Sequence, residues 1–340
     1  MTASPEASLP AGLTRGRIPD FFIVGHAKSG TTALYEMLKA HPQIFMPEYK
    51  GGFGKEPWFF SAENPNPQDG RERSIAFTGR GFMTVDAYLS LFAAAGAEQR
   101  VGEASTSYLW SRTAAQRIAE AQPNARIIAI MREPASFLRS VHLQLLQNHH
   151  ESERNFRKAV ALDDARREGR HIPRHSYWPQ ALIYSDRVRY AEQLRRYEAV
   201  FAREQMLVLI YDDFRDANEA TVRQVLRFLD VDDSAPVRPV HVNPTIGVRS
   251  ARLNDLKHAL REGRGPILRS VKGAGKALTS RSARESLYYP VQRRLVYRKP
   301  PPPDERFMRE LRRRFKGEVE ALSEYLDRDL VTLWGYDDLD

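Results

Sequence analysis

Three apolar runs predict buried strands along the first two thirds of the chain. They span residues 18–24, 125–134 and 205–214. The second run, ARIIAIMREP, is almost continuously apolar at its centre, as a strand covered on both faces of a parallel sheet requires. A shorter run at residues 99–103 predicts a further strand.

Amphipathic segments lie between these runs and predict helices. They cover residues 29–40, 84–95, 113–121, 135–148, 180–201, 219–229 and 304–326. The pattern also predicts a glycine-containing loop that leads into an aromatic strand at residues 50–60, and an irregular segment at residues 151–175. Alternating strands and helices predict an α/β fold, in which a parallel sheet carries helices on both faces.

The chain shows no internal repeat, and we expect a single domain over residues 18–340. Residues 1–17 lack a long apolar core and predict a disordered lead-in, not a signal peptide. The chain has no run of about 18 apolar residues, so no transmembrane helix is predicted. The absence of cysteine excludes a disulfide framework, a thiolate nucleophile and cysteine-ligated metals. It fits a cytoplasmic protein, or one bound peripherally at the inner face of a membrane.

Positive charge is concentrated near the C-terminal end. Residues 261–299 hold 11 Lys and Arg residues against Glu262 and Glu285, an excess equal to the net charge of +9 of the whole chain. This segment predicts a lid over an acceptor site, a peripheral membrane contact, or a solvated surface. A nucleic-acid partner is not expected, because no helix-turn-helix or RNA-recognition signature accompanies the charge.

The segment GHAKSGTT at residues 25–32, called the phosphate loop below, joins the first strand to the first helix. Glycines permit a tight turn, and the free N–H groups of a helix start attract an anion. The loop does not meet the ATP-binding pattern, since Thr31 follows Gly30 where that pattern has lysine. The strand at 126–131 also runs into Arg132, not into an acidic residue that could hold Mg²⁺.

A sulfuryl group carries less charge than a phosphoryl group from a nucleoside triphosphate. One lysine and backbone N–H groups can stabilise the charge that develops on the departing phosphate, without a metal. The form of the loop and the absence of an evident acidic residue that could hold Mg²⁺ therefore favour sulfuryl transfer. One alternative is a Mg²⁺-dependent nucleotide kinase or NTPase with a degenerate loop. The other is a catalytically inactive protein that binds an adenosine bisphosphate.

Two motifs together resemble the PAPS-dependent sulfotransferase family, where PAPS is 3′-phosphoadenosine 5′-phosphosulfate. The first is the loop Lys28-Ser29-Gly30-Thr31-Thr32, which is similar to the family's 5′-phosphosulfate loop. The second is Arg132 with Ser140 eight residues on, in MREPASFLRS. The resemblance implies a P-loop-NTPase-like fold, and it implies that Arg132 and Ser140 hold the 3′-phosphate of the donor. An arginine fork and a hydroxyl donor suit such a phosphate.

The branch of the family follows from GKEPWFF, residues 54–60. Lys55-Glu56 resembles an element of carbohydrate sulfotransferases of the heparan sulfate type and their bacterial relatives, and the resemblance implies that Glu56 is the catalytic base. GEASTSYLW (102–110) resembles the family's Glu-Lys-Thr-Pro-x-Tyr, with Ala104 where the lysine stands and Glu103 as a second-choice base or acceptor contact. Arg249 lies in a loop that in relatives closes over the 3′-phosphate.

The resulting prediction is an enzyme that transfers a sulfuryl group from PAPS to a hydroxyl group and releases PAP, the 3′,5′-bisphosphate. Glu56 deprotonates the acceptor, while Lys28 stabilises the leaving phosphate. The acceptor is a glycan, a glycolipid or a secondary metabolite, and no metal is required. His26 lies within the phosphate loop and is either a donor contact or a packing variant.

Overall fold

The computed structural model describes residues 18–48, 55–61, 85–176, 178–238, 240, 247–248 and 297–339. These residues divide into two compact units. The first unit takes described residues from 1–133, 189–242 and 320–328, and the second takes them from 134–188, 243–319 and 329–340.

A parallel sheet of five strands forms the centre of the first unit, in the order β2-β3-β1-β4-β5. The strands are β1 (Phe21–Gly25), β2 (Ile44–Phe45), β3 (Arg100–Ala104), β4 (Arg126–Met131) and β5 (Met206–Ile210). In the register, Phe21 of β1 pairs with Gly102 on one side and Arg126 on the other. All four strand pairings are parallel.

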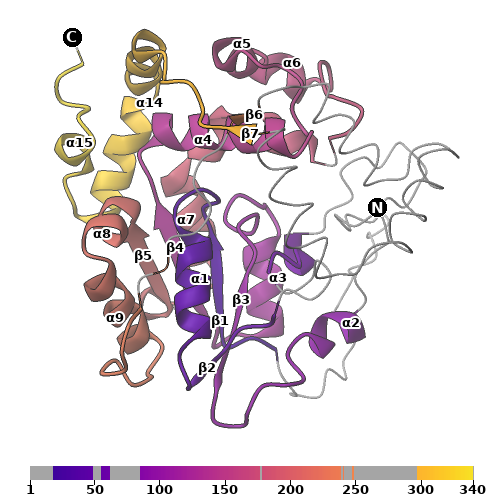
Figure 1. Cartoon of the computed structure of the whole chain (residues 1–340), viewed down its shortest axis with the longest axis vertical. Coiled ribbons are helices and arrows are strands. Elements are labelled where there is room, and N and C mark those ends of the chain that lie inside the picture. Colours follow the sequence, from indigo (N-terminus) through magenta and orange to yellow (C-terminus); the bar gives the residue numbers. More distant parts are fainter. Residues whose placement is uncertain are drawn as a thin grey trace, which may run out of the picture. The chain divides into compact units, whose positions relative to one another are not determined.

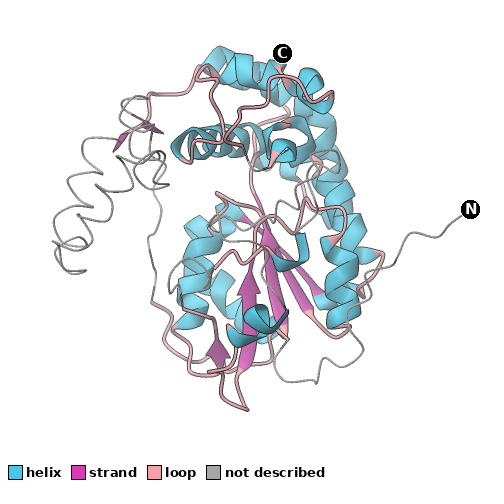
Figure 2. Ribbon diagram, turned by 90° about the vertical axis from the view of Figure 1, so that its right-hand side faces the viewer, coloured by secondary structure: helices cyan, strands magenta, loops and turns pink. Residues whose placement is uncertain are grey.

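Helices lie on both faces of this sheet (Figures 1 and 2). They are α1 (Thr31–Lys39), α2 (Val85–Ser90), α3 (Ala114–Ala121), α7 (Tyr190–Glu198), α8 (Tyr211–Asp216) and α9 (Asn218–Phe228). Ile23 and Ile128 of the strands share a buried core with Leu38 of α1 and Val225 of α9. The predicted parallel α/β architecture is therefore confirmed.

The predicted aromatic strand at the end of residues 50–60 is wrong. Phe59–Ser61 forms a short 3₁₀ turn. Side chains from the segment after β3 contact this turn. The backbone N–H of Phe60, which could pair with a neighbouring strand, donates to the hydroxyl of Tyr108 at 3.3 Å. The hydroxyls of Ser61 and Ser107 lie 2.8 Å apart. The ring of Phe60 packs edge-on against Phe22 of β1.

The second unit contains α4 (Pro134–Gln147), α5 (Phe156–Ala161), α6 (Asp163–Arg167) and α15 (Leu330–Leu333). It also holds the antiparallel pair β6 (Gly247–Val248) and β7 (Tyr297–Arg298). The helix α14 (Glu305–Leu326) begins in this unit, and its last residues belong to the first. The segment predicted as irregular thus contains two short helices, the first of them capped by the side chain of Asn155.

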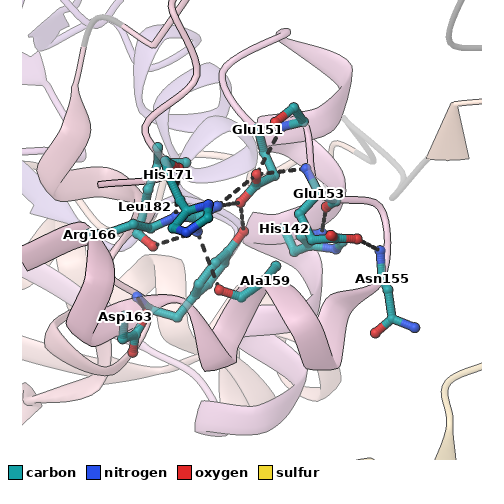
Figure 3. Close-up of polar contacts among 11 residues, drawn as sticks. His142, Glu151, Glu153, Asn155, Ala159, Asp163, Arg166, His171 and Leu182 are labelled. Carbon is teal, nitrogen blue, oxygen red and sulfur yellow. Dashed lines mark hydrogen bonds and ion pairs between the residues drawn. The ribbon is translucent and has the colours of Figure 1, made fainter. Parts of the chain in front are cut away.

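A buried ion pair stabilises the second unit (Figure 3). Arg166 and Glu151 lie 2.8 Å apart, with side chains 1% and 0% exposed. The guanidinium of Arg166 also donates to the carbonyl groups of Ala159 and Leu182 at 3.3 and 3.0 Å. The hydroxyl of Tyr184 donates to the same oxygen of Glu151, Oε2, at 3.1 Å, and Arg166 Nη2 also donates to Oε1 at 2.9 Å. Each charge therefore has several partners, as burial requires.

A second buried carboxylate, that of Asp163, explains why the helix predicted at 180–201 is interrupted. Two 3₁₀ turns, Pro179–Leu182 and Ser185–Val188, precede α7, which begins only at Tyr190. The buried carboxylate of Asp163 accepts the N–H groups of Tyr184 and Ser185 at 2.8 and 2.9 Å. These two N–H groups are therefore not available for the backbone hydrogen bonds of a continuous helix, and a tertiary contact overrides the local pattern.

Candidate functional site

The loops that follow β1, β3 and β4 meet at one edge of the sheet. The three strands are neighbours and run parallel, with β1 in the middle. Their carboxyl ends therefore lie side by side, and the chain connections diverge at this point. In open parallel sheets, ligands bind in this position. Lys28, Thr106 and Arg132 lie on these three loops, one on each.

The phosphate loop after β1 has a backbone that only particular residues adopt. Lys28 and Gly30 have φ angles of 64° and 89°, both in the left-handed region. At Gly30 an added Cβ would lie 2.8 Å from Cδ1 of Phe214, so glycine is required there for space as well as conformation. Gly30 is also the N-cap of α1, and as a glycine it has no side chain that could cap the helix. The first N–H groups of α1 are thus available to an anion.

Ser29 adds a hydroxyl group to this loop. Its side chain is fully buried, and its Oγ has no hydrogen-bond partner among the described residues. A buried hydroxyl without a partner is costly in a folded protein, and a ligand oxygen would remove that cost. Thr31 is buried and Thr32 half-buried at the start of α1.

Arg132 lies directly beside this loop. Its Nη1 donates to the carbonyl oxygen of Lys28 at 2.7 Å, and its guanidinium carbon lies 4.6 Å from the centre of the Tyr211 ring. Burial lowers the pKa of Lys28 below its ordinary value, and the positive charge of Arg132 lowers it further. Two cations held this close create a site of high positive potential, which a polyanionic ligand would stabilise.

Glu56 lies beside the loop that follows β3. Its backbone N–H donates to the carbonyl of Ala104 at 2.9 Å. The carboxylate accepts hydrogen bonds from Lys55 Nζ at 2.7 Å, from Trp58 Nε1 at 2.9 Å, and from the backbone N–H of Thr106 at 2.9 Å. The hydroxyl of Thr106 adds a further contact at 3.1 Å. The two motifs predicted to form the acceptor side, Lys55-Glu56 and GEASTSY, are thus brought together.

Glu103 is a second carboxyl group on the same side, but it is fully buried. Its Oε2 accepts hydrogen bonds from the hydroxyls of Tyr88 and Tyr108 at 2.9 and 2.8 Å. Burial raises the pKa of Glu103 to about 7, and the nearby charge of Glu56 adds to the rise. Complete burial makes Glu103 a poor direct base for an external acceptor, in contrast to the partly exposed Glu56.

No contact of the described residues tests the other two predicted donor residues. Ser140 is buried on α4 in the second unit, so its joint action with Arg132 stays a prediction. Arg249 lies outside the described residues, as do residues 1–17 and 261–296. Ala104, at the family's lysine position, is 0% exposed and belongs to the buried core that packs on α1.

Sequence reasoning missed Thr106, Trp58 and Tyr211 as parts of the site. Trp58 and Thr106 orient Glu56, and Tyr211 stacks on Arg132. Thr106 could have been found, since it follows a predicted strand end in a motif already recognised. The contact of Tyr211 depends on the fold alone. His26 packs inside the first unit: its side chain is fully buried and its Nε2 lies 2.8 Å from Oε1 of Gln193.

In the part of the chain that the structure describes, no group of three or more His, Cys, Asp or Glu side chains could hold a metal ion. Within the same residues, no helix is both long and apolar enough to cross a membrane.

The family model described as "Sulfotransferase family" matches residues 19–235. Carbohydrate sulfotransferase 15 of Mus musculus is 26% identical over 264 residues, which cover 63% of this chain and 44% of that protein. Heparan sulfate glucosamine 3-O-sulfotransferase 6 of Homo sapiens is 31% identical over 145 residues, which cover 42% of this chain and 35% of that protein. The chain therefore spans less than half the length of these curated relatives.

A solved structure extends the match to most of the chain. The sulfotransferase from Alicyclobacillus acidocaldarius superimposes with a TM-score of 0.63 at 26% identity, covering 94% of this chain and 99% of that one. The family-model match, residues 19–235, contains both motifs on which the resemblance was based.

Proposed function

Because this chain belongs to the sulfotransferase family, we propose that it transfers a sulfuryl group from PAPS to a hydroxyl group of a glycan. The family membership inferred from the two sequence motifs is confirmed. The observation that carries the donor part of the proposal is the close approach of Lys28 and Arg132 at the carboxyl edge of the sheet. PAPS carries phosphate groups at its 5′ and 3′ positions, and it would place negative charge beside both.

The donor is held from several sides in this proposal. Lys28, the hydroxyl of Ser29 and the first N–H groups of α1 bind the 5′-phosphosulfate, and Thr31 and Thr32 add hydroxyl donors. Arg132 and Ser140 bind the 3′-phosphate, which selects PAPS over simpler nucleotides. Support for a third contact from Arg249 is indirect. The strand that precedes it, β6, packs against α4, which carries Ser140.

Glu56 acts as the catalytic base. The acceptor oxygen attacks sulfur in line with the bond to the 5′-phosphate, and its proton passes to the Glu56 carboxylate. The new S–O bond forms as the old one breaks, and PAP leaves with the bonding electrons on its 5′-phosphate oxygen. Lys28 and the loop N–H groups stabilise that charge. Three side chains (Lys55, Trp58 and Thr106) fix the orientation of the base.

A glycan acceptor is supported by the names of two relatives, which specify a carbohydrate and a heparan sulfate glucosamine. Ala104 distinguishes this chain from relatives that carry a lysine near the acceptor. A lysine in the Ala104 side-chain position would enter the buried core. The acceptor is therefore expected to be a glycan whose recognition does not depend on that lysine, and glycolipids and hydroxylated secondary metabolites belong in the same screen.

The first test is calorimetric titration of the purified protein with PAP, AMP and ATP·Mg²⁺, repeated on Arg132→Ala. We expect tight binding of PAP, weak binding of AMP, and loss of the preference for PAP in the variant. Stronger binding of ATP·Mg²⁺ than of PAP would refute the donor assignment and favour a nucleotide kinase.

The base is tested separately by transfer of labelled sulfate from PAPS to a panel of glycans. Glu56→Gln should bind PAP as the wild type does and lose roughly a hundredfold or more in kcat, the scale of general base catalysis. Glu120→Gln, at an exposed position of α3, is the control for loss of one negative charge. Near-normal turnover of Glu56→Gln would exclude Glu56 as the base.

A further inference from the structure

Helix α7 connects the phosphate loop to Arg132 through two buried side chains that have no role in the mechanism above. They are Tyr190 and Gln193, which are 0% and 1% exposed. The two residues are three positions apart in the first turn of α7, so they lie on the same face of the helix. All of the contacts described next belong to the first unit.

Gln193 holds the beginning of the phosphate loop. Its Oε1 lies 2.8 Å from Nε2 of His26, in a buried contact between residues 167 positions apart. The backbone N–H of His26 also donates to the carbonyl of Ile130 in β4 at 3.0 Å. The first residue after β1 is therefore held both by α7 and by the neighbouring strand.

Tyr190 holds the other half of the donor site. Its hydroxyl donates to the carbonyl of Arg132 at 3.0 Å, and its ring lies 5.2 Å from the ring of His26. The chain leaves the first unit after Glu133 and returns to it at Arg189. The hydrogen bond between Tyr190 and Arg132 thus joins the place where the chain first leaves this unit to the place where it first returns.

These contacts form a closed cycle. It runs from His26 through Gln193 and the first turn of α7 to Tyr190, then to Arg132, and back to the loop through the bond from Arg132 to the Lys28 carbonyl. PAPS carries its 5′-phosphosulfate and its 3′-phosphate on one ribose, so the groups that bind them must be held at a matching separation. Preorganisation of this kind reduces the cost of binding.

We infer that Tyr190 and Gln193 are positioning residues that hold the phosphate loop and Arg132 in register for simultaneous binding of both ends of PAPS. This rests on the proposed function. Tyr190 acts on the 3′ side, because its hydroxyl bonds the backbone of Arg132. Gln193 acts on the 5′ side, because it bonds His26 in the phosphate loop. The two residues therefore affect different parts of the nucleotide.

The test compares PAP with AMP, which lacks only the 3′-phosphate. Tyr190→Phe removes one hydroxyl and keeps the ring. It should weaken PAP binding about fivefold, the value of one neutral hydrogen bond, and leave AMP binding unchanged. Gln193→Met removes the acceptor for His26 with little change in volume. It should weaken both PAP and AMP, because both carry the 5′-phosphate that the loop binds, and PAP by the larger factor, because only PAP depends on the register between the loop and Arg132.

Tyr88→Phe is the matched control. Tyr88 is 2% exposed in the same unit, and its hydroxyl donates to Glu103, away from the donor loop. The control should lower the unfolding temperature and leave the PAP preference of the wild type unchanged. If Tyr190→Phe behaves like this control, the inference is refuted while the proposed function stands. A wild-type protein that binds PAP no better than AMP would overturn both.

Discussion

The buried carboxyl group of Glu103 gives the protein a pH-dependent stability that one substitution should remove. Its pKa is raised from 4.5 to about 7 in the folded protein, mainly by burial. Below pH 4.5 the group is protonated in both the folded and the unfolded chain, so it costs nothing. As the pH rises towards 7, the unfolded chain releases the proton while the folded protein keeps it, and folding becomes less favourable. Above pH 7 the penalty is complete, at roughly 3 kcal/mol.

Glu103→Gln is the suitable perturbation, because a glutamine resembles the protonated carboxyl group in shape. Its amide oxygen can still accept from Tyr88 and Tyr108, whose hydroxyls donate to Glu103 at 2.9 and 2.8 Å. We expect the variant and the wild type to have similar free energies of unfolding near pH 4.5. Above pH 8 the variant should be more stable by about 3 kcal/mol.

Urea unfolding followed by tryptophan fluorescence at several pH values between 4.5 and 8.5 measures this difference. Glu120→Gln, exposed on α3, corrects for the change in net charge. A difference between variant and wild type that does not change across this pH range would refute the reasoning. It would mean that Glu103 reaches solvent or finds a cation in solution, and that its burial is not the dominant effect.

Three further outcomes follow from other contacts. Gly30→Ala should destabilise the fold by about 1–2 kcal/mol and weaken PAP binding, since φ is 89° and Phe214 occupies the space; thermal melts and PAP titration measure both. PAP affinity should fall as the pH rises towards 10.5, at a lower pH than for an ordinary lysine, because the lowered pKa lets Lys28 lose its proton earlier; calorimetry in that range should show proton uptake on PAP binding, absent in Lys28→Gln. Glu151→Gln should cost about 3–5 kcal/mol in urea unfolding, because it leaves buried Arg166 without its counterion.

The sequence predicts the elements whose pattern is set locally. The strand from Arg126 to Met131 is evident because it is buried on both faces, and α1 is evident because a glycine turn precedes an amphipathic run. The short strand β2 was missed, since Ile44–Phe45 has only two residues and no periodicity to read. The interrupted segment before α7 was missed because the cause, the carboxylate of Asp163, lies about 20 positions away.

The candidate site divides in the same way. Lys28, Glu56 and Arg132 belong to short motifs whose chemistry can be recognised in one stretch of chain. Thr106 and Tyr211 complete the site only after the sheet has formed, because each contacts a residue from another loop. A threonine and a tyrosine are common residues, and neither position carries a signal that distinguishes it from a surface or core residue.

The order of the strands explains why so many distant residues serve one reaction. Since β1 lies between β3 and β4, the loops after these three strands share one edge, although Lys28 and Arg132 are 104 positions apart. The loop after β1 supplies Lys28, and that after β4 supplies Arg132; the loop after β3 supplies Thr106, which orients Glu56. Donor binding and base positioning thus depend on different neighbours of the same central strand. A substitution on the β3 side should therefore change turnover while leaving PAP affinity intact, and one on the β4 side should do the reverse.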